Sequence, residues 1–246
     1  MKKMTSLKCL NANQLKFLAL FFMLLDHMWA TIIPGNQWLT NIGRMAFPIF
    51  AFQIVEGFYH TSNFKRYAQR LFLFALISEI PFNLFLTGSF IYPFHQNVMF
   101  TLLLGLLVIK VLDTARREKT WQRGLLALVT LIALSLLATL TMVDYGGMGV
   151  LTIVAFYLFR GFPGAWLGQL VSLVCLNVVF FQGLSIPLTI FGWTYDFPTQ
   201  GFAVFSLIFI WLYNGQKGSR NPGLQWVAYW FYPIHLLILY ALFYWR

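Results

Sequence analysis

Two adjacent ionisable residues, Asp26 and His27, lie within the first long apolar segment of the chain, residues 14–33. Their neighbours are Leu, Phe, Met, Ala and Trp. A charged side chain at the centre of a bilayer costs about 2.5–3.5 kcal/mol on insertion scales, so it is kept only with a partner, a water-filled cavity or a chemical role. An imidazole also suits general-base chemistry near neutral pH. The pair is therefore the first candidate for a functional site.

Lys16 lies about three helical turns before His27 in the same segment. That spacing returns to nearly the same face of a helix and covers about 16 Å along its axis. A ligand could bind Lys16 with an anionic end near the cytoplasm and present its other end to His27. A lysine at the end of a membrane helix also reaches the interface without any ligand, so both interpretations of Lys16 stay open.

Asp26 and His27 project about 100° apart because they are neighbours on a helix. We therefore expect Asp26 to pair with another cation rather than to orient the imidazole. Arg44 is the best candidate, since the predicted outer side carries only Arg44 and Arg246. Arg44 could also stabilise a developing oxyanion.

The partner that orients His27 should then come from another helix. Glu79 lies at a similar depth in the third segment and shares a helical face with Asn83, with Pro81 between them. We expect the Glu79 carboxylate to orient His27 and the Asn83 amide to be available for an oxyanion. The alternative is that Glu79 only holds two helices together.

A basic, hydrogen-bonding region follows the second segment. Glu56 and His60 share a helical face there, and Lys65, Arg66 and Arg70 come next. Such a region could hold a polyphosphate. The alternative is an ordinary helix end whose charges only orient the protein in the membrane.

Three further polar residues are candidates for a supporting role. Asn97 stands beside His95 at the outer start of the fourth segment, and Tyr145 belongs to an outer turn. His235 lies within the last segment, near Pro233. It could contact a substrate or simply form a hydrogen bond between helices.

The composition predicts an integral membrane protein. Of 246 residues, 59% are hydrophobic and 10% charged, and the mean hydropathy is +0.71, whereas soluble domains are about 45–50% apolar and about 25% charged. Residues 184–193 are apolar but too short to cross a membrane, and we expect an interfacial or re-entrant segment there. We predict one all-α domain over residues 1–246, a polytopic transmembrane bundle with about nine spans at 14–33, 42–59, 67–86, 97–113, 122–142, 147–160, 164–182, 198–213 and 225–245.

The basic residues orient this bundle. With the N-terminus in the cytoplasm, every Lys and Arg except Arg44 and Arg246 falls on the cytoplasmic side. The C-terminus then lies outside. The chain is thus predicted to be a multi-pass protein of a bacterial cytoplasmic membrane.

Other classes of function lack their signatures. The net charge of +10 belongs to short loops rather than to a soluble basic domain, so no nucleic-acid partner is expected. Cys9 and Cys175 have no metal-ligand spacing, and no metal is expected. The sequence also lacks a phosphate-binding glycine loop and a nucleophile elbow.

Several motifs together resemble the TraX family. They keep the family's order over nearly the whole chain and comprise residues 15–20, 23–27, 42–52, 55–58, 60–63, 67–71, 78–83, 97–102, 144–146 and 232–236. The family is named for a conjugation-plasmid protein that acetylates the N-terminus of pilin. It is distantly similar to transmembrane acyltransferases such as acyltransferase family 3, in which an Arg precedes the catalytic His at the spacing that here separates Lys16 from His27.

The resemblance implies an acyl-CoA-dependent acetyltransferase with His27 as general base. The donor would be acetyl-CoA from the cytoplasm, and the acceptor would be an amine or hydroxyl of a pilin-like peptide or a surface glycan. Transfer could be direct or pass through an acetyl-histidine. The catalytic residues would be His27, Asp26, Arg44 and Glu79; CoA would contact Lys16, His60, Lys65, Arg66 and Arg70; and Asn83, Asn97, Tyr145 and His235 would support the acceptor.

Two other functions stay open. In a transporter or channel, Asp26, His27, Glu79 and His235 would form a proton or ion path. In a scaffold of a pilus or secretion apparatus, the same polar residues would fasten helices together.

Overall fold

A computed structural model describes residues 8–181, 183–219 and 221–244. Four basic residues used above to orient the bundle, Lys2, Lys3, Arg220 and Arg246, lie outside the described residues. The described chain is mainly helical, and helices occupy all nine segments predicted from the sequence.

The first half of the chain forms helices that mostly begin at a polar cap and lie close to the predicted boundaries. They are α1 (Ala12–Ala30), α2 (Gln37–Gly43), α3 (Ala46–His60), α4 (Phe64–Thr87), α5 (Val98–Glu118) and α6 (Trp121–Leu140). Asn11 begins α1 with a capping box, since its side chain accepts from the Gln14 amide while the Gln14 side chain accepts from the Asn11 amide. Asn63 and Asn97 cap α4 and α5 in the same manner, through one side-chain oxygen each.

The second half contains shorter elements and one long final helix. They are α7 (Gly146–Phe159), α8 (Ala165–Val174) with its π-helical continuation η1 (Cys175–Phe180), the 3-10 helix η2 (Thr199–Phe205), α9 (Ser206–Trp211) and α10 (Pro222–Tyr244).

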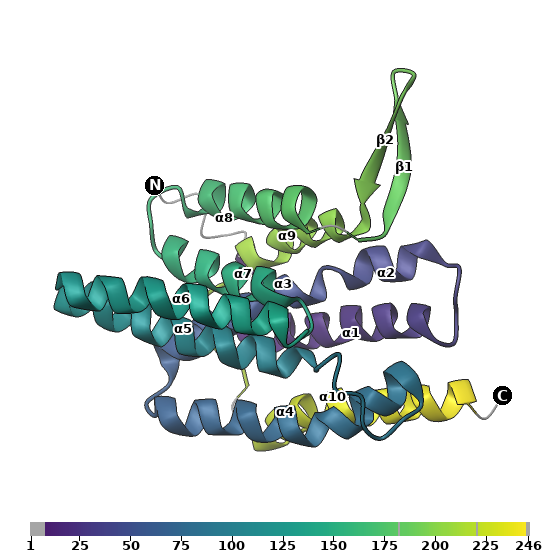
Figure 1. Cartoon of the computed structure of the whole chain (residues 1–246), viewed down its shortest axis with the longest axis horizontal. Helices are drawn as coiled ribbons and strands as arrows, with labels where there is room; N and C mark the ends of the chain where they lie inside the picture. Colours follow the sequence, from purple (N-terminus) through teal and green to yellow (C-terminus); the bar gives the residue numbers. More distant parts are fainter. Residues whose placement is uncertain (1–7, 182, 220, 245–246) are drawn as a thin grey trace.

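The helices pack in layers (Figure 1). α5, α6 and α7 pack on one another, and α1 packs on α2 and α3. α4 lies beside α10, and together they cover α1 and α5. α8 and α9 cover the opposite side of the bundle. This arrangement brings the first and last helices into contact, because α10 packs on α1 as well as on α4.

Four helices of the described chain are long and apolar enough to cross a membrane: α4, α5, α6 and α10. Their outward surfaces carry large apolar side chains, among them Leu125, Leu128 and Ile132 of α6. Such a surface fits lipid rather than water. α1 has 19 residues, but its polar residues lower its mean hydropathy, and α7, α8–η1 and η2–α9 are shorter. The all-α membrane class is supported, while the count of nine spans stays a prediction.

A β-hairpin departs from the all-α prediction. Residues 184–193, expected to form an interfacial or re-entrant segment, contribute β1 (Ser185–Ile190), which pairs antiparallel with β2 (Trp193–Pro198). The turn between them is Phe191-Gly192, and both residues have positive φ, 51° and 83°. A two-residue hairpin turn of type I′ requires this backbone. The segment is a strand because its apolar residues alternate with polar ones.

Candidate functional site: a histidine pair above a basic cavity

His27 of α1 and His235 of α10 form a hydrogen-bonded pair. His27 Nδ1 lies 2.7 Å from His235 Nε2. The two rings are within 8° of parallel, and their centroids are 5.0 Å apart. Together these values describe rings that meet edge to edge in nearly one plane, which aligns an N–H of one ring with the lone pair of the other.

A backbone carbonyl fixes the direction of this hydrogen bond. His235 Nδ1 lies 2.7 Å from the carbonyl oxygen of Phe231. Because a carbonyl only accepts, Nδ1 of His235 carries the hydrogen, and a neutral His235 then has its lone pair on Nε2. His27 Nδ1 must donate to that lone pair. The remaining nitrogen of His27, Nε2, is therefore left with a free lone pair, as a general base needs.

The two rings differ in their exposure. His235 is buried, with 5% of its surface exposed, while His27 is only partly buried. Phe85 of α4 packs on the His27 ring with a centroid distance of 5.0 Å. Within the described residues neither imidazole has a carboxylate at hydrogen-bond distance. His27 is thus the more exposed residue of the pair.

Glu79 does not orient His27, and this prediction was wrong. The Glu79 carboxylate accepts from the Asn97 side chain at 2.5 Å and from the Asn97 backbone amide at 3.4 Å. Asn97 also donates to the carbonyl of Ala75. The start of α5 therefore binds Glu79, because the first amides of a helix lack partners within the helix and attract an anion. His235, rather than Glu79, is the residue hydrogen-bonded to the His27 ring.

Asp26 pairs with Arg44, as predicted. Arg44 Nη2 lies 3.6 Å from Asp26 Oδ1, and Thr40 of α2 donates to the same oxygen at 2.6 Å. Arg44 also donates to the Thr40 hydroxyl at 3.1 Å. Gly43 allows α2 to approach this closely, because a Cβ added there would overlap Asp26. The cluster of Asp26, Thr40 and Arg44 holds α2 against the C-terminal end of α1.

A cavity of about 490 Å³ leads toward the histidine pair from the other end of α1. It lies between α4 and α10 on one side and α1, α3 and α5 on the other. Lys16, Leu20 and Met23 line it from α1, and the next residue on that helical stripe is His27. Tyr232 lines it from α10, one turn before His235. The lining on these two helices ends at Met23 and Tyr232, one turn before each histidine, and includes neither ring.

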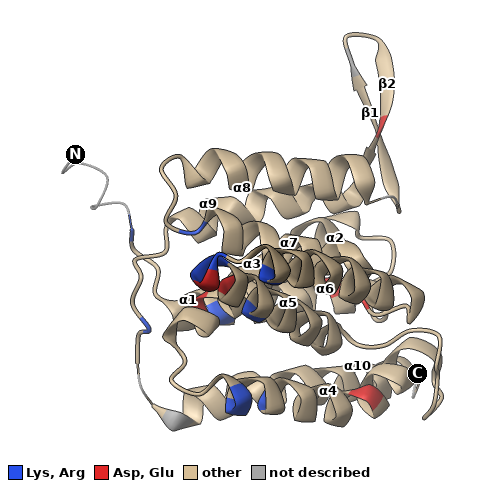
Figure 2. Cartoon of the chain, turned by 60° about the vertical axis from the view of Figure 1, so that its left-hand side comes forward, with Lys and Arg blue, Asp and Glu red and all other residues tan. Residues whose placement is uncertain are grey.

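The far end of this cavity is basic. Its lining includes Lys16, His60, Arg70 and Lys217, with Glu56 as its one carboxylate within the described chain. Glu56 is bound by Arg160 at 2.6 Å, which leaves Lys16, Arg70 and Lys217 as unneutralised positive charges in the described structure. Figure 2 shows the basic segments near the start of α4 and around the ends of α3 and α5.

Two predicted ligand residues lie away from this cavity. Lys65 and Arg66 belong to the exposed first turn of α4 and are not part of the lining. A turn of helix separates them from Arg70, whose side chain does line the cavity. Lys217, Tyr229 and Tyr232 were missed, because the late loop and the apolar last segment carry no local sign of a cavity.

The other candidates make contacts within the bundle, near the end where α4 meets the loop before α5. The Asn83 amide nitrogen donates to the carbonyl of Phe90 at 3.2 Å. Tyr145 stacks on Phe47 with ring centroids 3.9 Å apart. His95 lies 3.8 Å from the carboxylate of Asp144. A substrate-contacting or supporting role for Asn83, Asn97 or Tyr145 stays a prediction.

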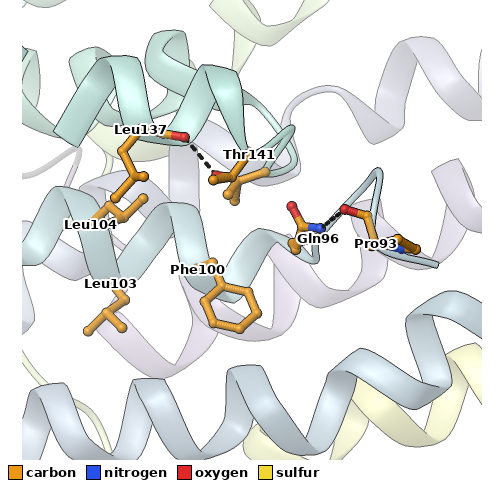
Figure 3. A pocket seen from close by; sticks show the side chains of 8 residues that line it. Pro93, Gln96, Phe100, Leu103, Leu104, Leu137 and Thr141 are labelled. Carbon is orange, nitrogen blue, oxygen red and sulfur yellow. Dashed lines mark hydrogen bonds between the residues drawn. The ribbon is translucent and has the colours of Figure 1, made fainter. Parts of the chain in front are cut away.

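A second cavity, of about 400 Å³, opens between α5 and α6 (Figure 3). Its lining residues are uncharged: Pro93, Gln96, Phe100, Leu103, Leu104, Leu137, Thr141 and Val143. The polar side chains there bond to nearby carbonyls, Gln96 to Pro93 and Thr141 to Leu137, each at 2.7 Å. This crevice suits an apolar chain and holds no group that could do acid–base chemistry.

Comparisons with known proteins place these features in context. The model of a family described as TraX protein matches residues 11–243. A curated protein of Dichelobacter nodosus, "Probable fimbrial assembly protein FimC, serogroup H1", is 28% identical over 247 residues, covering 93% of this chain and 94% of that protein. No solved structure matches.

Proposed function

The chain belongs to the TraX family, and from this premise we propose that it is an integral membrane acetyltransferase. The donor is acetyl-CoA, and the acceptor is an amine or a hydroxyl. The observation that carries the proposal is the free Nε2 lone pair of His27, held by the His27–His235 hydrogen bond one helical turn beyond the lining of a basic cavity.

The cavity suits an acyl-CoA. Its basic end, with Lys16, Arg70 and Lys217, attracts the phosphates of CoA. Further along, Leu20, Met23 and Tyr232 offer an apolar wall to the thin pantetheine arm. Lys16 and His27 are about 16 Å apart along α1, a length that an extended pantetheine arm spans. The thioester carbonyl then arrives beside His27.

The reaction follows from the tautomer of His27. Nε2 takes a proton from the acceptor as its nitrogen or oxygen forms a bond to the thioester carbonyl carbon. The resulting imidazolium keeps its Nδ1 hydrogen bond to His235 Nε2. When the tetrahedral intermediate collapses, the carbon–sulfur bond breaks and the same proton passes to the CoA sulfur. The products are the acetylated acceptor and free CoA, and His27 returns to its starting state.

The arrangement of the helices favours the predicted topology. The start of α1 and the end of α10 lie at opposite ends of the bundle (Figure 1), which agrees with an odd number of crossings. The basic cavity opens at the end where α1 begins. We propose that this end faces the cytoplasm of a bacterial cell and that α10 ends outside, with one domain spanning the cytoplasmic membrane several times.

The relative's name gives a direction for the acceptor. That protein is named as a probable fimbrial assembly protein, so a pilin-like peptide with a free N-terminal amine is our first choice of acceptor. The same name favours a second candidate function, a scaffold of a fimbrial apparatus. A scaffold would bind neither CoA nor acetyl-CoA.

The test uses the purified full chain in lipid nanodiscs. Acetyl-CoA at about 100 times its dissociation constant should stabilise the protein by roughly 2.7 kcal/mol, seen as a rise in Tm. Radiolabelled acetyl-CoA should transfer its acetyl group to a peptide with a free N-terminus. His27→Ala should abolish transfer while preserving the rise in Tm, and His95→Ala serves as the matched histidine control with transfer retained.

Two outcomes would overturn the proposal. Full acetyl transfer by the His27→Ala variant would show that His27 is not the general base. The absence of a rise in Tm with either CoA or acetyl-CoA would favour the scaffold. Flux of a solute into sealed vesicles without any covalent change would instead favour a transporter.

A further inference from the structure

The hairpin of β1 and β2 stands apart from the helices. Figures 1 and 2 both show it projecting beyond α8 at the end of the bundle where α1 meets α2, and its strands run across the helix axes. Helices that cross a membrane place such a hairpin along the plane of the bilayer. Under the proposed topology this is the outer surface.

The strand register gives the hairpin one wholly apolar face. Residues directly opposite each other in an antiparallel pair share a face. The pairs Ile186–Phe197 and Leu188–Tyr195, together with Trp193, therefore lie on one face, and Ser185–Pro198, Pro187–Asp196 and Thr189–Thr194 lie on the other. All five of these residues of the first face are apolar or aromatic. The second face holds the threonines and Asp196, the one charged residue of the two strands.

No described part of the chain covers the apolar face along most of its length. The exposed fractions are 40% for Leu188, 56% for Tyr195 and 82% for Trp193, and Phe191 at the turn is 99% exposed. A two-stranded hairpin is marginally stable in water on its own. An amphipathic hairpin of this kind needs an apolar environment on one face.

The base of the hairpin is fixed to the bundle. Phe197 packs edge to face on Phe202 of η2, with ring centroids 5.8 Å apart. The Thr199 amide donates to the carbonyl of Leu184 at 2.7 Å, and Gly201 leaves room for the Phe197 ring. The strands therefore leave the bundle in a set direction rather than on a loose tether.

We propose that the apolar face of this hairpin lies on the surface of the lipid bilayer. Three observations favour lipid. The strands run across the axes of the helices, Trp193 and Tyr195 are residue types enriched where acyl chains meet headgroups, and η1, which contacts β2, also exposes apolar side chains, Val179 and Phe180. The polar face, with Thr189, Thr194 and Asp196, then meets water.

Addition of a strand from a partner protein fits less well. Pro187 lies in β1 and has no backbone N–H, so it interrupts the row of donors that a partner strand would need. The apolar side chains also project from one face of the two-stranded sheet, whereas a partner strand would pair with the backbone of an edge strand. A flat apolar surface rimmed by a polar face suits an interface between lipid and water.

The experiment compares the two faces with nitroxide spin labels. In the full chain carrying Cys9→Ser and Cys175→Ser, single cysteines replace Leu188 or Tyr195 on the apolar face and Thr189 or Thr194 on the polar face. The protein is reconstituted in vesicles of phosphatidylethanolamine and phosphatidylglycerol. Collision of each label with oxygen, which concentrates in lipid, is measured against collision with a water-soluble nickel chelate.

The labels at 188 and 195 should collide with oxygen in preference to nickel, and the labels at 189 and 194 should show the reverse. Equal access of nickel to both faces would overturn the proposal. Shielding of the apolar face from both reagents, or spin–spin broadening between labels, would overturn it in favour of a protein partner or a second copy. Quenching of a fluorescent label at the same cysteines by brominated lipids provides a second measurement.

Discussion

His27 Nδ1 lies 2.7 Å from His235 Nε2, although almost the whole chain separates the two residues. The carbonyl of Phe231 holds the other nitrogen of His235. This chain of two hydrogen bonds does for His27 what a carboxylate does in many hydrolases, because it fixes the tautomer and the orientation of the ring. Unlike a carboxylate, a neutral imidazole does this without placing a negative charge among the helices.

The role of His235 as a positioning residue can be tested by its replacement. His235→Phe keeps a ring but removes the acceptor for His27 Nδ1–H, so we expect kcat to fall about tenfold, the worth of one hydrogen bond. His235→Gln supplies an amide oxygen and should recover part of the rate. Acetyl transfer to a peptide amine measures both. Equal rates for the two variants, at unchanged Tm, would rule out the hydrogen bond as the cause.

Lys16 should act on donor binding rather than on the chemical step. Its side chain lines the basic end of the cavity, so Lys16→Ala should raise KM for acetyl-CoA about tenfold, as expected for one charged hydrogen bond, and leave kcat nearly unchanged. Lys16→Arg should keep a low KM. Lys65→Ala, which removes a lysine outside the cavity, is the control. A similar rise in KM for Lys65→Ala would indicate a diffuse charge effect instead.

The pair of Arg44 and Asp26 should contribute to stability. Arg44→Ala leaves the Asp26 carboxylate with Thr40 as its remaining described partner, and we expect a loss of about 1–3 kcal/mol, since the pair is only partly buried. The double variant Arg44→Met, Asp26→Leu should recover much of that loss, because it leaves no unpaired charge. Unfolding in mixed detergent micelles measures the three proteins. A double variant as unstable as Arg44→Ala would contradict this account.

Close packing at Gly43 makes a separate prediction. Gly43→Ala forces a methyl group against Asp26, so we expect a loss of about 1–3 kcal/mol from the strain of overpacking. Gly124→Ala in α6 is the matched control, because a Cβ there meets open space. That variant should be neutral or more stable by up to about 1 kcal/mol, as alanine favours helix over glycine. Equal effects of the two substitutions on stability would show that α2 can shift away from α1 at little energetic cost, and would contradict tight packing at Gly43.

The pair of His95 and Asp144 predicts a dependence of stability on pH. The carboxylate of Asp144, 3.8 Å away, raises the pKa of the His95 imidazole above its usual value, and the charge of Glu79 adds to this. The folded protein therefore holds this proton more tightly than the unfolded chain. The added stability is complete below the ordinary histidine pKa of about 6.5 and is lost as the pH rises through the raised pKa of His95.

The size of this effect should be small. Both side chains are partly exposed, so we expect about 0.2–1 kcal/mol. As the pH is raised from below about 6.5 through the pKa of His95, the Tm of the wild type should fall more steeply than the Tm of the His95→Gln variant. Parallel curves for the two proteins would contradict the assignment.

Much of the architecture follows from local sequence. Apolar segments of about 20 residues predict helices because each buried backbone group must find its partner within the segment. The Asp26–Arg44 pair was also predictable, since the predicted outer side offers Asp26 one nearby cation. The hairpin could have been found as well: its alternating apolar residues and the Phe191-Gly192 turn are local signs of strands, which the high overall hydropathy of the segment concealed.

The sequence by itself determined that ionisable residues lie within apolar helices, and it predicts that the basic residues gather on one side of the membrane, because hydropathy and charge act residue by residue. Only the tertiary structure decided that His235, rather than Glu79, meets His27. That choice depends on α10 packing beside α1 and on the start of α5 binding Glu79. No local pattern specifies which helices become neighbours, since the packing of whole helix faces across the bundle selects them.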